Sequence, residues 1–357
     1  MRYNPQGTGA SSESLTNYKV IRIGDVAFEG HTNREFQYGR FVVNDLGDGI
    51  MSPRFSVLRP VGPFNISYWK QYLHCERYIN RILVRSTKAG TMMNELVYND
   101  LSKEFVYCPS NNEQQKIGKL LSKVDFAITL HEDKKRQLER IKSALLQKIF
   151  ADKSGYPAVR FEGFSAEWEQ RKLGDVGKTY TGLSGKAKED FGHGEASFVT
   201  YMNVYSNPVS DLKMTEPIEI DNHQNEVKYG DVFFTTSSET PEEVGMASVW
   251  TGDKNNTYLN SFCFGYRPLQ RIDPYYLSYL LHSESVRRKI IILAQGISRY
   301  NISKKGVMKI STTFPSLDEQ DQIGSLFQHI DHTITLHDQK LSFLKRLKQT
   351  LLQKMFI

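Results

Sequence analysis

The sequence predicts an α/β (α+β) protein: two globular domains in tandem, joined by two long antiparallel helices that form a coiled-coil spacer about an internal pseudo-twofold axis. The first observation is a repeat. Residues 113–151 and 319–357 align without a gap, 206 positions apart, and roughly half of the aligned positions are identical. A repeat of this kind usually reflects duplicated architecture. The other two observations are a helical apolar spacing in both copies and short, turn-bounded apolar runs ahead of each copy.

The repeated segments are predicted to be long helices over residues 113–152 and 319–357. Apolar side chains recur at spacings of three and four in both. Neither segment contains proline, and each has one glycine, near its start (Gly118 and Gly324). Thirty-nine helical residues would extend ~58 Å at 1.5 Å per residue. A narrow apolar stripe on so long a helix indicates a partner helix, and the only other segment of matching length is its repeat.

Two histidines and a basic run lie on these predicted helices. His131 and His337 occupy the same place in a shared ITLH tetrad. Without a second pair of ligands nearby, we expect them to fix the register between the helices rather than to bind metal. The Lys and Arg residues between positions 134 and 148 are expected to be a solvated helix face.

Two globular domains are predicted, over residues 1–112 and 153–318. The second follows a linker-like stretch at 153–164. Short β-branched and aromatic runs at 197–203, 231–236, 247–250 and 262–266 predict strands separated by Gly, Asn and Asp turns. Residues 275–293, which follow Pro274, predict a helix. The domain is therefore of mixed α and β type.

The first domain matches only the later part of the second. Gly-Asp-Val occurs at 24–26 and again at 230–232, and Arg-Pro occurs at 59–60 and at 267–268. Residues 68–73 align with 275–280, and Gly90 aligns with Gly296. No counterpart exists for residues 168–221. We therefore expect the first domain to be shortened at its N-terminal side by some fifty-odd residues.

Composition excludes several classes of protein. The net charge of +6 is modest and is compatible with a polyanionic partner over part of the surface. Three scattered cysteines argue against a disulfide framework and a clustered zinc site. No apolar stretch approaches the ~20 residues of a membrane span, and the N-terminus lacks a signal core. We expect a soluble, cytoplasmic protein.

Catalytic motifs are absent or weak. No methyltransferase motif is found, and 182–186 (GLSGK) lacks the spacing of a nucleotide-binding loop. The nearest approach to a metal-dependent nuclease is Asp221 with Glu226 and Lys228, because such enzymes need clustered carboxylates and a lysine. The corresponding part of the first domain lacks the glutamate. An autonomous nuclease therefore remains only an alternative.

Polar loops favour nucleic-acid binding. In the second domain, residues 235–239 follow an apolar strand and residues 295–301 follow a helix; 31–34 and 85–94 occupy similar places in the first. Arginine pairs with guanine, Asn and Gln pair with adenine, and hydroxyls bond phosphates or bases. The residues predicted to contact DNA are Arg34, Arg85, Thr87, Lys88, Thr91, Asn94, Thr235, Thr236, Ser237, Ser238, Gln295, Ser298, Arg299, Tyr300 and Asn301.

Taken together, these residues resemble the specificity subunit of type I restriction-modification enzymes. The matching motifs are EWEQRKLGD at 167–175, P-x-x-x-EQ-x-x-I at 109–117 and 315–323, the two ITLH segments and the LLQK-[IM]-F endings. Each motif is weak alone, but the set is specific and covers nearly the whole chain. In that family each globular domain recognises one half of an interrupted DNA site, and the helices set the gap.

The resemblance also implies the partners. The chain itself would be non-catalytic and bind no cofactor. Two modification subunits would dock beside the helices and methylate adenine with S-adenosylmethionine, and restriction subunits would translocate DNA with ATP and Mg²⁺. Inserting four residues near Lys134 should then lengthen the tolerated gap. A coiled-coil adaptor that never touches DNA is a further alternative.

One departure from the family pattern is visible. Family members usually carry their own W-x-x-x-x-LG segment before the first domain, and this sequence has none there. The resemblance then implies either a truncated or non-functional allele, or a first domain completed by a second polypeptide.

Overall fold

The computed structural model describes residues 15–90, 93–151 and 154–356. The chain forms two compact units, which are described separately. Unit 1 comprises residues 1–134 and 337–357, and unit 2 comprises residues 135–336. Helices α5 (Asn111–Lys148) and α11 (Leu317–Met355) each begin in one unit and end in the other. Each segment predicted to be a long helix forms a single helix, although α5 ends at Lys148 and not at residue 152. No helix in the described ranges is apolar enough over its length to cross a bilayer.

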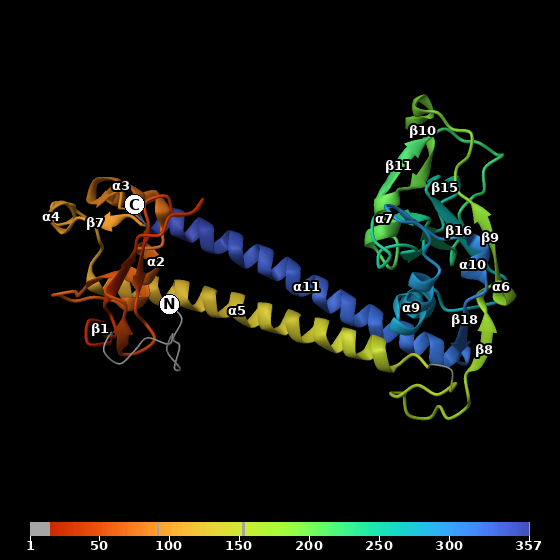
Figure 1. The fold of residues 1–357 in the computed structure, drawn as a ribbon, viewed down its shortest axis with the longest axis horizontal. Coiled ribbons are helices and arrows are strands. Elements are labelled where there is room, and N and C mark those ends of the chain that lie inside the picture. Colours follow the sequence, from red (N-terminus) through yellow and green to blue (C-terminus); the bar gives the residue numbers. More distant parts are fainter. Residues whose placement is uncertain (1–14, 91–92, 152–153, 357) are drawn as a thin grey trace. The chain divides into compact units, whose positions relative to one another are not determined.

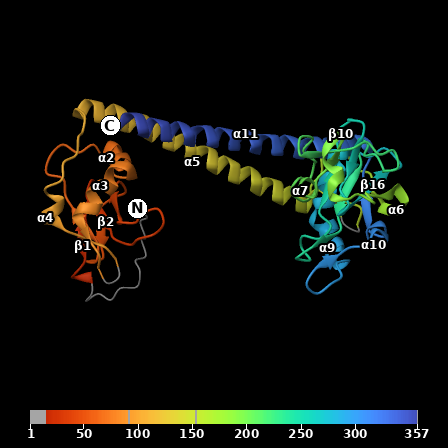
Figure 2. The same ribbon diagram turned by 90° about the horizontal axis from the view of Figure 1, so that it is seen from above.

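Unit 1 is built around a small antiparallel sheet in the order β3–β2–β5. Its strands and short helices are β1 (Lys19–Ile21), β2 (Val26–Glu29), β3 (Arg40–Val43), β4 (Gly49–Met51), β5 (Ser56–Leu58), α2 (Ile66–Tyr72), α3 (Glu76–Ser86), β6 (Thr87–Lys88), β7 (Glu95–Leu96) and α4 (Tyr98–Leu101). Val26 of the central strand is opposite Val43 on one side and Leu58 on the other. Helices α2 and α3 lie beside these strands (Figure 2).

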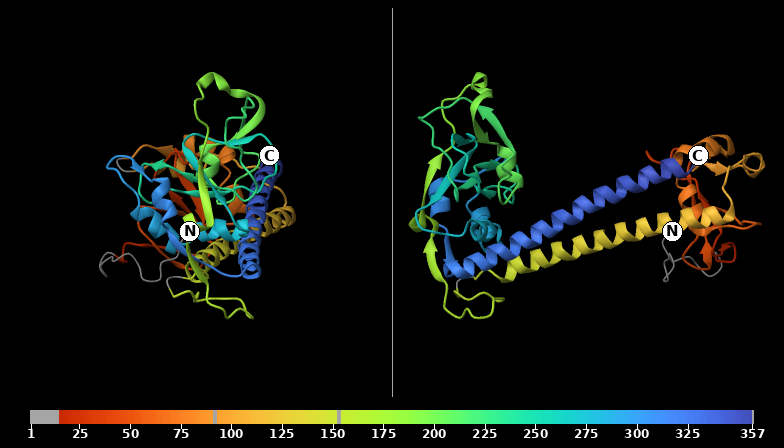
Figure 3. Two further views of the ribbon diagram at one scale, coloured as in Figure 1. Left: turned by 90° about the vertical axis from the view of Figure 1, so that its right-hand side faces the viewer. Right: turned by 180° about the vertical axis from the view of Figure 1, so that it is seen from behind.

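An aromatic cluster on α2 closes the core of unit 1. The Tyr68 and Tyr72 rings each lie 5.4 Å from the ring of Phe356. Phe356 directly follows the last residue of α11 and is buried, and its carbonyl oxygen accepts a hydrogen bond from the Tyr78 hydroxyl. Figure 3 shows the C-terminal end of α11 among the elements of unit 1. The core of unit 1 therefore depends on the last residues described.

Unit 2 contains a four-stranded sheet in the order β14–β12–β16–β9 and a three-stranded sheet in the order β11–β10–β15 (Figure 1). Its elements before α11 are β8 (Glu169–Lys172), α6 (Leu173–Val176), β9 (Gly177–Thr181), η1 (Lys188–Asp190), β10 (Phe191–Val199), α7 (Tyr201–Ser206), β11 (Thr215–Ile218), β12 (Val232–Thr235), β13 (Ser237–Ser238), β14 (Ala247–Val249), β15 (Thr257–Leu259), β16 (Cys263–Pro268), α8 (Pro274–His282), α9 (Glu284–Ile292), β17 (Tyr300–Asn301), α10 (Lys304–Met308) and β18 (Ser311–Phe314). Every residue of β12 is buried, which explains its continuous apolar character.

Two predicted elements of unit 2 end earlier than expected. The predicted strand at 197–203 stops at Val199, because the Thr200 side chain accepts the backbone N–H of Asn203 and starts α7. The predicted helix at 275–293 is two helices. Ser283 has extended backbone angles, and its hydroxyl caps α9 by accepting the N–H of Val286. Polar capping residues inside apolar runs explain both corrections.

The core of unit 2 repeats the aromatic arrangement of unit 1. Phe150, just past the end of α5, lies 5.8 Å from the ring of Tyr276 and 6.0 Å from that of Phe327. Phe150 and Phe356 are 206 positions apart. Tyr276 thus occupies the place of Tyr68, so the predicted alignment of 68–73 with 275–280 is wrong by one residue.

The helix-start glycines mark close approaches in both units. A Cβ atom built on Gly118 would lie 2.7 Å from the backbone nitrogen of Tyr68. On Gly324 it would lie 2.8 Å from the backbone nitrogen of Tyr276. Real Cβ atoms do not approach other atoms so closely, so each long helix needs glycine where it crosses the start of α2 or α8.

Within unit 1, the described parts of α5 and α11 run antiparallel. The Lys348 ammonium contacts the Asp125 carboxylate at 2.7 Å. Lys345 contacts Glu132 at 2.8 Å, so positions rise along one helix while they fall along the other. Gln71 of α2 also donates to Asp125, at 2.6 Å.

The shared histidines face each other inside unit 1. The Nδ1 atoms of His131 and His337 are 2.9 Å apart, and partial burial together with the neighbouring His337 lowers the pKa of His131. No group of three or more His, Cys, Asp or Glu residues within the described ranges could hold a metal ion. Their facing position is the one expected of a polar pair that fixes helix register.

Unit 2 shows the matching contact between its own parts of these helices. Lys142 of α5 contacts Asp331 of α11 at 2.6 Å, and the Tyr279 hydroxyl donates to Asp331 at 2.7 Å. Lys142 and Asp331 are each 206 positions from Lys348 and Asp125. The same carboxylate–lysine contact therefore occurs in each unit with the roles of the two helices exchanged.

Replacement of Phe356 by alanine should destabilise unit 1 by about 3–5 kcal/mol, because it leaves a cavity beside the rings of Tyr68 and Tyr72. Hydrogen exchange followed by mass spectrometry should show faster exchange in α2 and unchanged exchange in β12 of unit 2. Phe343→Ala, at a half-exposed position of the same helix, is the control. Equal effects of the two variants on α2 would contradict this packing.

The stability of unit 2 should fall as the pH falls from 6.5 towards 4. Desolvation lowers the pKa of His282 to about 4, while its Nδ1 lies 2.9 Å from the Ser278 carbonyl oxygen. The unfolded chain takes up the proton near pH 6.5 and the folded unit does not. The free energy of unfolding should therefore decrease by about 2 kcal/mol between pH 7 and pH 5. His282→Gln should remove this part of the slope in denaturant titrations, and an unchanged slope would refute the assignment.

Candidate nucleic-acid interface

The two polar loops predicted in the second domain meet in unit 2. Strand β13 pairs antiparallel with β17, with Ser237 opposite Asn301 and Ser238 opposite Tyr300. The Ile302 N–H also donates to the carbonyl oxygen of Thr236, at 3.0 Å. Segments some sixty residues apart in sequence thus form one surface at the end of the buried strand β12.

The loop at 295–301 is closed by its own backbone. The N–H groups of Gln295 and Asn301 donate to each other's carbonyl oxygens, at 2.9 and 2.8 Å. Gly296 has a φ of +140°, and a Cβ atom there would lie 2.0 Å from the carbonyl oxygen of Arg299. Only glycine fits this turn, which explains the glycine in the predicted binding loop.

The tip of this loop presents donors and one apolar side chain to solvent. Gln295, Ser298, Arg299 and Asn301 are exposed, and Ile297 is 95% exposed. Amide, hydroxyl and guanidinium groups of this kind bond base edges and phosphates. An isolated apolar side chain among them is of the type that enters a base step.

Tyr201 and Tyr205, which the sequence interpretation did not single out, also adjoin this surface. The Tyr201 hydroxyl donates to the carbonyl oxygen of Ser237 at 3.1 Å, and the two tyrosine rings stack at 6.1 Å. Both residues lie on α7, and Tyr201 falls within the segment 197–203 that was predicted to be a strand. Residues four apart lie one above the other on a helix, which places the two rings side by side.

Some of the predicted contact residues in unit 2 have internal roles. Thr235 is fully buried, and its hydroxyl accepts the N–H of Met246 at 3.0 Å. Ser238 is buried and donates to Glu243 at 3.3 Å. The Thr236 hydroxyl donates to the Phe262 carbonyl oxygen. Thr235 and Ser238 support the loop and are not free to contact a ligand as they stand.

Unit 1 has a matching junction. Strands β6 and β7 pair with Thr87 opposite Leu96, and the Asn94 N–H donates to the carbonyl oxygen of Gly30 at 2.9 Å. A Cβ atom on Gly30 would lie 1.9 Å from the Asn94 carbonyl oxygen. The end of β2 and the loop before β7 therefore meet as the two loops of unit 2 do.

The predicted contact residues of unit 1 differ in availability. Arg34 is exposed, whereas Arg85 makes two hydrogen bonds to Glu104, at 2.8 and 2.6 Å. The Thr87 hydroxyl donates to the Leu83 carbonyl oxygen, and Lys88 contacts Glu95 at 3.2 Å. Thr91 lies outside the described residues. To contact DNA, Arg85 and Lys88 would each have to leave a carboxylate partner and pair with a phosphate instead.

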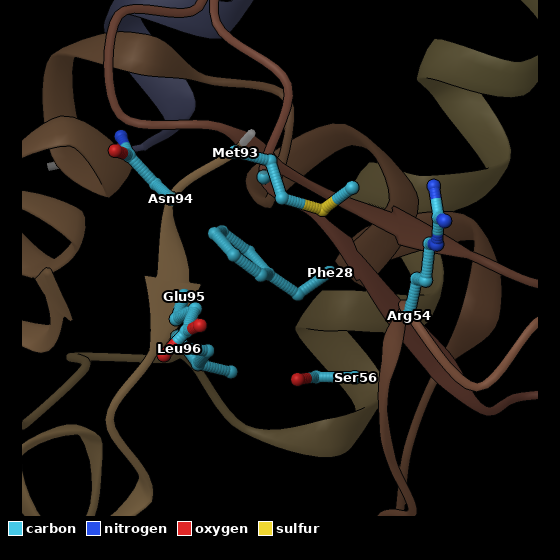
Figure 4. A pocket seen from close by; sticks show the side chains of 8 residues that line it. Phe28, Arg54, Ser56, Met93, Asn94, Glu95 and Leu96 are labelled. Carbon is cyan, nitrogen blue, oxygen red and sulfur yellow. The ribbon is translucent and has the colours of Figure 1, made fainter. Parts of the chain in front are cut away.

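A cavity of about 450 Å³ adjoins this junction (Figure 4). It is lined by Phe28, Gly30, Arg54, Ser56, Met93, Asn94, Glu95 and Leu96. Figure 4 shows the Arg54 side chain on the rim across from Glu95. Arg54 lies in the turn before β5, outside the predicted polar loops. Arg54 reaches the cavity because strands distant in the sequence lie close together in the fold, and no sequence motif indicates this position.

In each unit a buried aspartate is paired with an arginine. The Arg59 guanidinium donates twice to Asp25, at 2.8 and 2.7 Å, and Arg267 donates twice to Asp231, at 2.7 and 2.6 Å. The hydrogen bond from Arg59 lowers the pKa of Asp25 although burial opposes this. Each aspartate directly precedes its strand, β2 or β12, so the Gly-Asp-Val repeat and the Arg-Pro repeat are two halves of one contact.

The candidate nuclease residues are separately engaged. Lys186 contacts Asp221 at 2.7 Å and holds the pKa of that carboxyl well below its usual range. Glu226 accepts the backbone N–H of Asn256 at 2.6 Å. No metal-binding group of three such side chains occurs in the described ranges. The alternative of an autonomous nuclease is therefore not supported.

Comparison with known proteins agrees with this geometry. Residues 165–346 match the sequence profile of the type I restriction modification DNA specificity domain. The chain is 24% identical over 198 residues to a protein named as the MjaX specificity subunit of a type I restriction enzyme in Methanocaldococcus jannaschii. The match covers 53% of this chain and 45% of that protein, so the chain spans about half the length of this curated relative.

Solved structures of similar fold cover almost the whole chain. An S subunit of a type I restriction-modification system from M. genitalium superposes with a TM-score of 0.55 at 14% identity, over 95% of this chain and 84% of its own. The HsdS subunit from Thermoanaerobacter tengcongensis gives 0.50 at 21% identity, over 98% and 83%. A structure of a type I R-M system gives 0.53 at 18% identity, over 95% and 83%. At these identities the likeness concerns the fold.

Proposed function

The chain belongs to the type I restriction modification DNA specificity family, and we propose that it selects the DNA sequence in a type I restriction-modification enzyme and carries out no chemistry itself. One observation carries the proposal. In each unit a backbone hydrogen bond joins the end of a buried strand to a polar loop: Asn94 to Gly30 and Ile302 to Thr236. A repeated junction with exposed donors suits a protein that recognises two half-sites.

In unit 2 the reading surface is proposed to consist of Gln295, Ser298, Arg299 and Asn301, with Tyr201 supporting it. In unit 1 it is proposed to consist of Arg34, Arg54 and Asn94, with Arg85 and Lys88 recruited from their carboxylate partners. Thr235 and Ser238 hold the loop in place. Side chains that are exposed and lack internal partners lose the least on binding, so Arg34 and Arg299 should dominate.

We further propose that α5 and α11 form one continuous coiled coil with a pseudo-twofold axis, and that this coil is the spacer between the two reading surfaces. The exchanged lysine–carboxylate contacts, Lys348 with Asp125 and Lys142 with Asp331, support this. The proposed recognition domains then comprise residues 1–112 and 153–318, and the proposed spacer helices comprise residues 113–152 and 319–357. A rigid spacer fixes the number of base pairs between half-sites.

The partners and cofactors proposed are those that the family implies. Two modification subunits that use S-adenosylmethionine would dock beside the helices, and restriction subunits would supply ATP- and Mg²⁺-dependent translocation. The assembly would act on double-stranded DNA in the cytoplasm. An adaptor that never touches DNA has no support from the family match.

Arg299→Ala should weaken binding to the selected duplex about tenfold or more and relax the base preference at one position of one half-site, because arginine contacts discriminate by ~1–3 kcal/mol. Fluorescence anisotropy at fixed salt measures the affinity. Arg271→Ala, an exposed arginine outside both loops, is the matched control. Equal losses from the two variants would show that Arg299 contributes only non-specific charge.

Matched insertions of four residues after Lys134 and after Asp338 should lengthen the gap in the recognised site and leave both half-sites unchanged. Each insertion adds about one helical turn at the same level of an antiparallel pair. Methylome sequencing of cells that carry the variant measures the site. A variant that methylates the original gap would contradict the spacer role.

A further inference from the structure

One surface of unit 2 is covered by an extended segment of the same chain. Trp168 is buried, its ring lies 6.3 Å from that of Tyr276, and its Nε1 donates to Glu319 at 3.2 Å. Arg160 donates twice to the same carboxylate, at 2.7 and 2.8 Å. Glu319 is 1% exposed: Arg160 neutralises its charge, and Arg160 and Trp168 together satisfy it away from water.

The segment then continues as a strand. Residues of β8 pair antiparallel with β18, from Glu169 opposite Phe314 to Lys172 opposite Ser311 (Figure 1). Leu173 is buried, and its N–H donates to the carbonyl oxygen of Ile310 at 2.9 Å. Residues 160–173 therefore supply an arginine, a tryptophan, one strand and a leucine to a single surface.

Unit 1 carries the same underlying surface. Tyr68, Phe356 and Glu113 occupy the places of Tyr276, Phe150 and Glu319. The beginnings of the two long helices also match: the Gln114 side chain donates to the carbonyl oxygen of Pro109 at 2.9 Å. Gln320 donates to that of Pro315 at the same distance. The residues that precede Pro109, 105–108, thus correspond to β18.

No covering segment is present on this surface within the described residues. A cavity of about 210 Å³ is lined by Tyr68, Tyr72, Tyr107, Cys108, Pro109, Glu113, Met355 and Phe356. Phe105 and Tyr107 are each 87% exposed, and residues 105–108 pair with no strand in the described part of the chain. The Glu113 carboxylate is exposed and makes no hydrogen bond or ion pair with any described side chain. Unpaired strand edges and exposed aromatic side chains of this kind are sites for added strands.

We propose that this surface, called here the open socket (Tyr68, Glu113, Phe356 and residues 105–108), binds an added peptide segment with the chemistry of residues 160–173: an arginine, a tryptophan eight residues later and a strand that ends in leucine. The tryptophan fills the cavity against Tyr68 and Phe356. The arginine pairs with Glu113, and the strand pairs with residues 105–108.

The described part of this chain holds no second segment of this kind, and a second copy offers it only in buried form. The 357-residue sequence holds three tryptophans, and only Trp168 lies in such a segment. That segment is already buried on unit 2, so a second copy could supply it only by opening its own unit. The binding depends on packing, charge and strand pairing in unit 1 and is independent of the DNA contacts proposed above.

A labelled peptide with the sequence of residues 160–175 tests the socket on the intact chain. Fluorescence anisotropy should show saturable binding, and alanine in place of the peptide's tryptophan should weaken it more than tenfold. Glu113→Gln in the protein should weaken it about tenfold, the size expected for a charge-assisted pair. Glu76→Gln, at an exposed glutamate on α3, should bind as the wild type does. A Glu113→Arg protein should recover binding when the peptide carries glutamate for its arginine.

Hydrogen exchange locates the peptide. Protection at residues 105–108 and in α2, with no change at β18, supports the proposal. Protection at β18, which would mean that the peptide displaces the resident segment of unit 2, overturns it. Three other results would also overturn the proposal. These are binding that does not depend on the peptide's tryptophan, absence of binding, and self-association of the chain that protects residues 105–108 without peptide.

Discussion

Both cores are closed by a phenylalanine at the end of a helix that begins in the other unit. Phe150 packs on Tyr276 in unit 2, and Phe356 packs on Tyr68 and Tyr72 in unit 1. Each helix must therefore run its full length before either core is complete. The same dependence explains why α5 and α11 have matching sequences. Each helix packs against the start of the other helix, and the phenylalanine just past its own end closes the core of the unit in which it ends. Loss of either end would remove several kcal/mol from one unit.

A second constraint links this framework to the polar loops. The paired Asp25–Arg59 and Asp231–Arg267 side chains fix the starts of β2 and β12, whose ends lead into the loops. Aspartates almost removed from solvent need such partners. The loops beyond them vary freely between the units, whereas the ion pair and the glycines beneath them do not. A constant scaffold that carries differing loops is a common arrangement for binding residues.

The sequence was informative where chemistry repeats along the chain. The long helices, the Gly-Asp-Val and Arg-Pro repeats and the family could all be predicted, because each leaves a linear pattern. The break at Ser283 was missed, because one capping hydroxyl inside an apolar run interrupts the helix without changing its periodicity. Arg54 and Tyr201 reach the candidate interface only through packing across strands. Burial of Thr235 was equally invisible, because Thr235 is the polar last residue of β12, a strand that is buried on both faces. The ion pair between Arg160 and Glu319 joins residues 159 positions apart, so no local sequence pattern indicates it.

The central claim is that two reading units act on one DNA site through a fixed spacer. It is tested most directly by selecting bound duplexes from a random-sequence pool with the chain assembled on its modification subunits. The account predicts two short motifs separated by a constant number of unspecified base pairs. A single continuous motif, or enrichment of two motifs at variable separation, would contradict it.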